Sequence, residues 1–218
     1  MPSTIPKIYN NWIHRLLKSQ SIFELLSLKE GDVIYLTDPS LLLVNMHGIL
    51  STVKKYTQHK SSIFTLSPPN TLLYYKTNNS ICYHKVQALT NSYVLVFYNI
   101  DTLTDKFISN KIKSMELRSL NLHILYLDSL VLLFVQNTVT KRLVIFLLTL
   151  AKQVGCFSDS KIVIQFALPH TYLAEVLGTT RVSITRSIQK LDKKFIVVER
   201  KATTIFNPIS LVSYVLKE

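Results

Sequence analysis

Glycine, cysteine and acidic residues are scarce in this chain of 218 residues. It has 4 glycines, 2 cysteines and 13 acidic residues, against 25 lysines and arginines. The chain has no glycine-rich phosphate-binding loop, and two cysteines are too few for an iron–sulfur cluster, which takes about four. Cys82 and Cys156 also lack the spacing of metal ligands, so we expect no metal site and two buried free thiols in a reducing compartment.

Long hydrophobic runs are absent as well, although 48% of the residues are hydrophobic. No run reaches the roughly 18 apolar residues that a membrane helix needs, and the N-terminus lacks the apolar core of a secretory signal. We therefore expect no membrane partner. The 6 histidines form no metalloprotease pattern and no nucleophile elbow is present, so we expect that the chain is not an enzyme.

What the chain does have is positive charge, and this charge is unevenly distributed. The formal net charge is +12; residues 141–218 carry +7 of it and the longer stretch 1–140 carries +5. The charge density is therefore more than doubled in the C-terminal part. Such a field favours a polyanion such as double-stranded DNA, although a generally basic surface remains the alternative.

The segment Leu168–Leu191 reads as two short helices joined by a tight turn at Gly178. Glycine supplies the backbone freedom that the turn needs, and the small Ala174 allows the helices to cross closely. Apolar residues at helical spacing should face inward, namely Leu173, Leu177, Ile184, Ile188 and Leu191. Thr179 or Thr180 should cap the second helix. The pattern indicates a helix-turn-helix whose second helix enters a DNA major groove.

The DNA-binding residues predicted from this motif lie at the start of both helices. Guanidinium groups can pair with guanine O6 and N7, hydroxyl groups can bind phosphates or base edges, and lysines suit phosphates. Lys193 and Lys194 should assist through phosphates. The predicted residues are His170, Thr171, Thr180, Arg181, Val182, Ser183, Thr185, Arg186 and Lys190. The alternative is an ordinary amphipathic helix pair with a solvated basic face.

The part before this motif has a different pattern. Residues 1–27 carry apolar side chains at helical spacing, namely Trp12, Ile13, Leu16, Leu17, Phe23, Leu25 and Leu26. From residue 28 to about 97 short β-rich runs alternate with turn residues, which predicts an antiparallel sandwich, roll or barrel. The expected strands are Val33–Leu36, Leu41–Val44, Ile49–Val53, Ile63–Leu66, Leu72–Tyr75, Cys82–Val86 and Val94–Tyr98. We assign 28–110 to this sensor-like domain.

A long helix is predicted at 111–136. Apolar residues there alternate steps of three and four, as in the a/d seam at which two helices interlock: Leu117, Leu120, Ile124, Leu127, Val131 and Phe134. A second apolar stripe, Leu122, Leu125, Leu132 and Leu133, should pack on the helix's own domain. We favour a homodimer, because helix-turn-helix proteins typically bind two half-sites as dimers; a helix buried within a monomer is the alternative.

We assign 137–218 to the DNA-binding domain. A helix at 138–154 should end at Gly155 as a glycine C-cap, and Lys161–Phe166 should form a strand. After the recognition helix, Phe195–Glu199 and Thr203–Phe206 flank Arg200, Lys201 and Ala202, which predicts the β-hairpin wing of a winged helix-turn-helix. A last helix is expected at Ile209–Leu216.

The runs TKRLVIFLLTLAKQVG and GTTRVSITRSIQKLDKK resemble the catabolite-activator/FNR family of transcription regulators. Within that family TTRVSITR is similar to the STRVTVTR of the global nitrogen regulator NtcA type and its red-algal plastid-encoded relatives. The resemblance is specific over residues 138–207. It implies an α+β fold: an N-terminal antiparallel β-roll, cyclic-nucleotide-binding-like, then a long dimerisation helix and a C-terminal winged helix-turn-helix.

The resemblance also implies a mode of action. Arg181 and Arg186 correspond to the family's base- and phosphate-reading arginines. Val182 stands where cyclic-AMP-type members have glutamate, so the expected site is a GTA-N8-TAC palindrome. Ser187 stands at a usually apolar position. The implied function is activation of nitrogen-controlled genes by contact with RNA polymerase, in a plastid stroma if the chain is algal and otherwise in a bacterial cytoplasm.

The effector site departs from the family pattern. Nitrogen regulators bind 2-oxoglutarate with two arginines, but here Ile81 and His123 occupy those positions, beside the loop residues Leu72, Leu73 and Tyr74, with Asp128 retained. A buried dicarboxylate without arginines would be uncompensated, at a cost of several kcal/mol. We therefore expect no cofactor and a lost or altered effector site. The alternative function is a non-specific DNA-binding or architectural protein with a degenerate effector domain.

Overall fold

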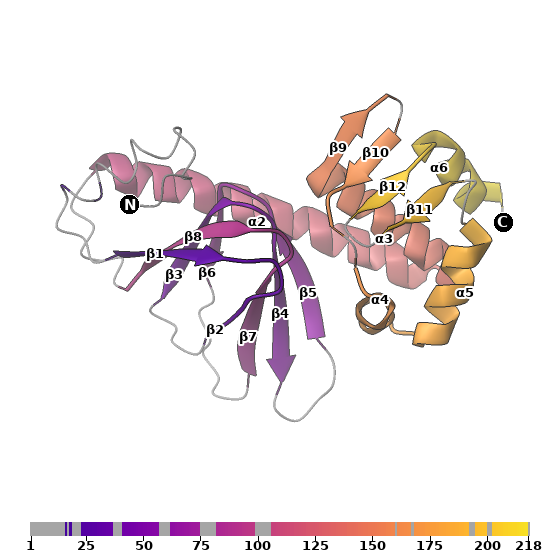
Figure 1. The fold of residues 1–218 in the computed structure, drawn as a ribbon, viewed down its shortest axis with the longest axis horizontal. Coiled ribbons are helices and arrows are strands. Elements are labelled where there is room, and N and C mark those ends of the chain that lie inside the picture. Colours follow the sequence, from indigo (N-terminus) through magenta and orange to yellow (C-terminus); the bar gives the residue numbers. More distant parts are fainter. Residues whose placement is uncertain are drawn as a thin grey trace. The chain divides into compact units, whose positions relative to one another are not determined.

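The computed structural model describes residues 16, 18, 23–36, 41–56, 62–74, 82–98, 106–159, 161–166, 168–191, 195–199 and 202–217. The chain divides into two compact units. One comprises Met1–Lys60 and Phe64–Leu122, and the other comprises Ser61–Ile63 and His123–Glu218. Figure 1 shows a β-rich first unit and a C-terminal unit of helices and short strands, which confirms the predicted α+β class.

Two four-stranded sheets form the β-rich unit. The first has the order β1-β8-β3-β6, with β1 (Phe23–Leu28), β8 (Ser92–Phe97), β3 (Leu42–His47) and β6 (Thr71–Tyr74). The second has the order β2-β7-β4-β5, with β2 (Val33–Leu36), β7 (Cys82–Ala88), β4 (Leu50–Tyr56) and β5 (Ser62–Ser67). The described registers are antiparallel, and the seven strands expected from the sequence are all present.

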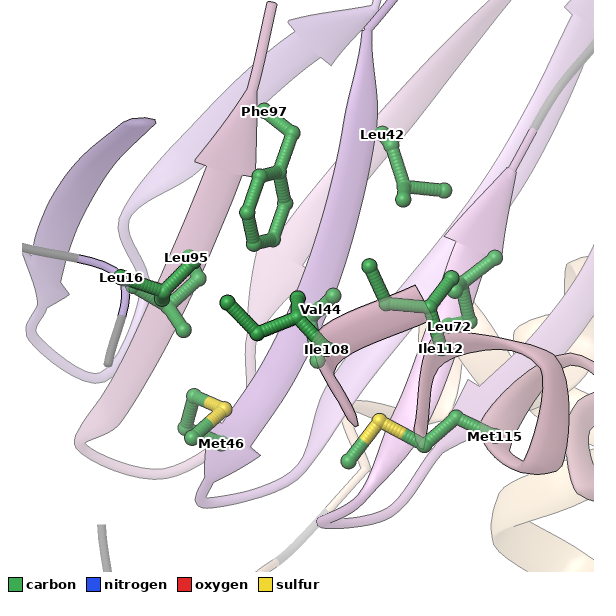
Figure 2. Close-up of a cluster of buried hydrophobic side chains, with 10 residues drawn as sticks. All are labelled: Leu16, Leu42, Val44, Met46, Leu72, Leu95, Phe97, Ile108, Ile112 and Met115. Carbon is green, nitrogen blue, oxygen red and sulfur yellow. The ribbon is translucent and has the colours of Figure 1, made fainter. Parts of the chain in front are cut away.

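The first sheet is buried on both faces, because alternate residues of a strand point to opposite sides. Leu42 and Val44 of β3 join one hydrophobic cluster, and Leu43 between them joins another. Figure 2 shows the first cluster, in which side chains of this sheet meet Leu16 and three residues of the long helix. The second cluster includes the core-facing residues of β2, β4 and β7, so it lies between the two sheets.

The helical segment predicted for residues 1–27 is corrected at its end. Leu16 and Lys18 are helical, and Trp12, Ile13 and Leu17 lie outside the described residues. Phe23–Leu28, however, is strand β1, which pairs with β8 from Phe23↔Phe97 to Leu28↔Ser92. The apolar residues of this stretch pack on both faces of the sheet, so strand pairing overrides a spacing that also suits a helix.

The long helix α2 (Lys106–Val135) begins before the predicted start at residue 111. Its buried face carries Ile108, Ile112, Met115, Tyr126 and Leu133. Of the predicted second stripe only Leu133 is fully buried, and Leu125 and Leu132 are exposed. By length and composition alone α2 would also suit a membrane crossing, the one such helix among the described residues.

In the C-terminal unit, α3 (Val139–Val154) leads into a four-stranded sheet of order β11-β12-β10-β9. Its strands are β9 (Gly155–Ser158), β10 (Lys161–Ile164), β11 (Ile196–Val198) and β12 (Thr203–Ile205). Between β10 and β11 come α4 (His170–Val176) and α5 (Arg181–Leu191), and α6 (Pro208–Lys217) ends the chain. The helix-turn-helix and a wing hairpin therefore lie in one unit (Figure 1).

One expectation for this unit is confirmed and one is corrected. Gly155 is the C-cap of α3 as predicted, in an extended conformation with φ −75° and ψ 140°, and its amide donates to the Ala151 carbonyl. Glycine is needed because a Cβ would overlap the Ala151 carbonyl oxygen and the Ile162 side chain. Cys156 is exposed and not buried, because β9 is an edge strand whose outer side is uncovered. The Cys82 side chain lies outside the described residues.

Candidate nucleic-acid interface

The turn between α4 and α5 is closed by the backbone. Gly178 has φ +60°, a left-handed conformation that strains other residues. The Thr179 amide donates to the Ala174 carbonyl at 2.9 Å and the Gly178 amide to that of Glu175 at 3.4 Å. These two bonds form a Schellman motif, which satisfies carbonyls at the end of a helix. The predicted turn at Gly178 is therefore present, and it sets the angle at which α5 leaves α4.

Thr180 begins the recognition helix. Its Oγ1 accepts a hydrogen bond from the Ser183 amide at 3.2 Å and lies 3.0 Å from Ser183 Oγ. Of the two threonines considered, Thr180 is thus the N-cap. Such a cap satisfies an amide at the helix start that has no partner within the helix. The side chains of Thr180 and Ser183 therefore stabilise the first turn of α5.

The buried face of α5 is the predicted one, comprising Ile184, Ile188 and Leu191. Ser187, a polar residue at a usually apolar position, is 6% exposed. Its Oγ lies 3.2 Å from Thr140 Oγ1 of α3, so the buried hydroxyl has a partner. This hydrogen bond joins the recognition helix to α3 and satisfies the Ser187 hydroxyl.

The opposite face of α5 is open. Arg181, Val182, Arg186 and Lys190 are exposed, and Ser183 and Thr185 are half-buried. From the start of α4, Thr171 is exposed and His170 is half-buried. Thr180 is also exposed. The nine predicted DNA-binding residues thus belong to the beginning of α4 and to α5 with its cap. An α-helix with its side chains is about 10–12 Å in diameter, so α5 fits a groove about 12 Å wide.

His170 links the two helices. Its Nδ1 lies 3.0 Å from Thr185 Oγ1, and the Thr185 hydroxyl is also placed to donate to the Arg181 carbonyl at 3.0 Å. The first residue of α4 is therefore bonded to the middle of α5. This contact fixes one side chain of the open face, and the sequence pattern did not indicate it.

Arg142 of α3 is a second residue that the motif did not identify. Its Nε donates to the Gln136 carbonyl at 2.9 Å and its Nη1 donates to the Leu177 carbonyl at 3.4 Å. One guanidinium thus binds the segment just after α2 and the turn of the helix-turn-helix. The signal in the sequence is an arginine directly beside the apolar face of a helix, in KRLVIFLL.

Lys190 receives support from the last helix. Its Nζ lies 5.7 Å from the centroid of the Tyr214 ring, and the Phe195 ring lies 5.6 Å from that of Tyr214. A cation over an aromatic face is attracted by the ring quadrupole. α6 therefore helps to position a lysine at the end of the recognition helix. Lys193 and Lys194 lie outside the described residues.

The wing is the hairpin of β11 and β12. Val197 pairs with Thr204, and the Glu199 amide donates to the Ala202 carbonyl at 2.8 Å. At the base of the hairpin the Phe206 amide donates to the Phe195 carbonyl at 2.9 Å. The basic residues Arg200 and Lys201 at the tip lie outside the described residues.

The residues predicted for an effector pocket are divided between the two units. Leu72 packs in the cluster with Leu16, and Leu73 packs in the cluster between the sheets. His123 and Asp128 are exposed on α2. Ile81 lies outside the described residues, and of Tyr74 only the backbone is described. The Leu72 amide donates to Ser119 Oγ of α2 at 2.7 Å, so this strand is bound to the helix directly.

One ionisable side chain lies inside the β-rich unit. His84 of β7 is 5% exposed, and it lies opposite Leu36 and Lys54 in the neighbouring strands. Burial, and to a lesser extent the charge of Lys54, lowers the pKa of His84 from 6.5 to about 4. The imidazole is therefore neutral at physiological pH. Among the described residues no group of His, Cys, Asp or Glu could hold a metal ion.

Comparison with known proteins agrees with the helix-turn-helix geometry of α4 and α5. Residues 141–214 match the Crp-like helix-turn-helix domain. An HTH-type transcriptional regulator, ycf28, of Porphyra purpurea is 28% identical over 93% of this chain and 86% of its own length. The global nitrogen regulator of Synechococcus elongatus is 35% identical over 44% of this chain and 43% of its own length.

The whole fold has counterparts among solved structures. A CRP-family transcriptional regulator from Thermus thermophilus superposes with a TM-score of 0.67 at 15% identity, over 87% of this chain and 96% of that chain. At this identity the likeness concerns the fold, and it confirms the predicted architecture. These relatives and fold neighbours are transcription regulators and not enzymes, in agreement with the prediction from the sequence.

Proposed function

We propose that the chain is a transcription regulator of the CRP/FNR type, close to the global nitrogen regulators, and that it binds a palindromic DNA site as a homodimer. The observation that carries the proposal is the open face of α5, which presents Arg181 and Arg186 beside exposed polar residues. Arginine pairs with guanine O6 and N7 in the major groove. The proposed site is GTA-N8-TAC, whose half-sites lie about 11 base pairs apart, close to one helical turn.

The dimer is supported by the surface of α2. The six seam residues Leu117, Leu120, Ile124, Leu127, Val131 and Phe134 are all exposed, by between 43% and 70%. An apolar stripe of this length is rarely left in water on a soluble protein. A second copy of α2 would cover it by knobs-into-holes packing and would supply the second recognition helix. Activation of nitrogen-controlled genes through RNA polymerase is the regulatory part of the proposal.

The test is a gel shift with the full chain on GTA-N8-TAC DNA and on scrambled DNA. Arg181→Ala removes one guanidinium from each half-site, and each bidentate pair contributes about 1–3 kcal/mol of discrimination. We expect specific affinity to fall at least about tenfold, with little change for scrambled DNA. Arg118→Ala, which removes the same charge from an exposed position on α2, is the matched control and should bind as the wild type does.

Equal affinity of the wild type for the palindrome and for scrambled DNA would refute the proposal. That result would favour the second candidate, a non-specific DNA-binding or architectural protein. The absence of arginine at positions 81 and 123, where the sequence has Ile81 and His123, is the observation behind that candidate. The ratio of specific to non-specific affinity at physiological salt separates the two.

A further inference from the structure

We propose that Thr185 recognises the 5-methyl group of a thymine, through its own methyl group beside the Val182 side chain and not through its hydroxyl. The inference rests on the proposed function, in which α5 enters the major groove. It assigns to this position a specificity for thymine that a hydroxyl, which can bond many groups, would not give.

The hydroxyl of Thr185 is already engaged within the protein. Its Oγ1 lies 3.0 Å from the Arg181 carbonyl oxygen and 3.0 Å from His170 Nδ1. When Nδ1 carries a proton it donates to Oγ1, and the hydroxyl proton goes to the carbonyl. When Nδ1 is bare it accepts the hydroxyl proton itself. A hydroxyl has a single proton, so both tautomers keep it inside the protein.

This engagement removes the donor that a threonine hydroxyl would otherwise offer to a base edge. Guanine O6 and N7, adenine N7 and thymine O4 are all acceptors on the major-groove edge. They need a donor, and Thr185 has none to give. The remaining substituent of its Cβ is a methyl group, which is suited to apolar contact.

The neighbours of Thr185 on the helix complete an apolar surface. Thr185 follows Val182 by three residues and Arg181 by four, and residues at these spacings share one helix face. Val182 is 58% exposed, although it is an aliphatic residue on a basic face. On this face Val182 and the half-buried Thr185 thus lie between the exposed Arg181 and Arg186. Thymine is the base that presents a methyl group in the major groove.

His170 is a positioning residue in this account. It comes from α4, and its bond to Oγ1 holds the Thr185 rotamer in which the hydroxyl lies toward the Arg181 carbonyl. The methyl group is thereby fixed in place before DNA binds. A fixed group loses less conformational entropy on binding than a free one.

The experiment replaces thymine by uracil, which lacks only the 5-methyl group, at each symmetric pair of positions in the palindrome in turn. One buried methyl group contributes about fourfold in affinity, so we expect about a 15-fold loss for the full chain at one pair of positions. Replacing any of the other thymines should change the affinity less than twofold.

Two variants separate the methyl group from the hydroxyl. Thr185→Val keeps a methyl group at the same place and should keep the uracil penalty. Thr185→Ser keeps the hydroxyl and its bonds, and should reduce the penalty to below about twofold. Circular dichroism establishes that both variants are folded. The opposite pattern, with the penalty kept by serine and lost in valine, would overturn the inference.

The failure of the inference differs from the failure of the proposed function. If binding is sequence-specific and depends on Arg181, but uracil has no effect at any thymine, the inference is wrong and the proposed function stands. If the wild type does not distinguish the palindrome from scrambled DNA, both are wrong.

Discussion

The recognition helix and the β-rich unit differ in what their side chains are available to do. Thr180 caps the N-terminus of α5, and one face of this helix is buried in the C-terminal unit. On the opposite face Arg181 and Val182 are exposed. In the β-rich unit the described side chains predicted to bind a ligand, Leu72 and Leu73, are packed in hydrophobic clusters. The comparison teaches that the open face of α5 leaves side chains free for a partner, whereas burial in the core leaves Leu72 and Leu73 unavailable to a ligand.

The largest effect is expected from the dimer seam. Ile124→Lys places a charge on the exposed stripe of α2, where it does not disturb the fold but would be buried in a dimer. We expect monomers, and a loss of DNA affinity of about 100-fold or more, because two linked recognition helices gain about 10²–10⁴ in affinity over one. Analytical ultracentrifugation and a gel shift measure the two quantities.

Ser114→Lys is the control for this change, since Ser114 is an exposed polar residue on the same helix outside the seam. It should leave both dimer and DNA binding intact. If the Ile124→Lys variant remained a dimer and bound DNA with the affinity of the wild type, the proposed dimer seam on α2 would be wrong. The claim that two recognition helices bind DNA together would also be weakened.

The β-rich unit should respond to pH in a way that the recognition helix does not. His84 has a pKa of about 4 in the folded protein and about 6.5 when unfolded, because burial disfavours its charged form. A lowered histidine pKa contributes stability that is complete above pH 6.5 and is lost as the pH falls toward 4. The free energy of unfolding, followed by urea denaturation from pH 7.5 to 4.5, should therefore decrease.

His84→Gln should flatten that dependence, whereas His47→Gln, at an exposed histidine of β3, should leave it unchanged. An identical pH dependence in wild type and His84→Gln would show that another group controls the acid stability of this unit.

Much of the fold followed from residue periodicity. The short β-rich runs of β3 and β8, which turn residues separate from their neighbours, and the three-and-four spacing of α2 are local patterns, and the structure has strands and a helix there. Gly178 gave the turn because few residues other than glycine adopt φ +60°. Apolar spacing misassigned Phe23–Leu28, because the pairing of β1 with β8 joins residues about seventy positions apart and leaves no local trace.

The parts of the candidate interface that the sequence did not indicate depend on tertiary contacts. Arg142 donates to the backbone carbonyls of Gln136 and Leu177. Every residue has such a carbonyl, so the sequence cannot indicate these partners. The His170–Thr185 bond joins side chains 15 residues apart, and Tyr214 reaches Lys190 from the last helix. For Ser187 the sequence indicated only an unusual polar residue, and the partner Thr140 lies 47 residues away.

The central claim is that the recognition helix reads DNA specifically without 2-oxoglutarate, the dicarboxylate for which the sequence has no arginine at position 81 or 123. The most direct measurement is the affinity of the full chain for GTA-N8-TAC and scrambled DNA, with and without millimolar 2-oxoglutarate. We predict specific binding whose affinity changes less than about twofold on addition of the ligand. A compound that binds the free and the DNA-bound protein equally, or binds neither, does not shift the binding equilibrium. A tightening of specific binding by about tenfold or more, or micromolar binding of 2-oxoglutarate by calorimetry, would contradict the account.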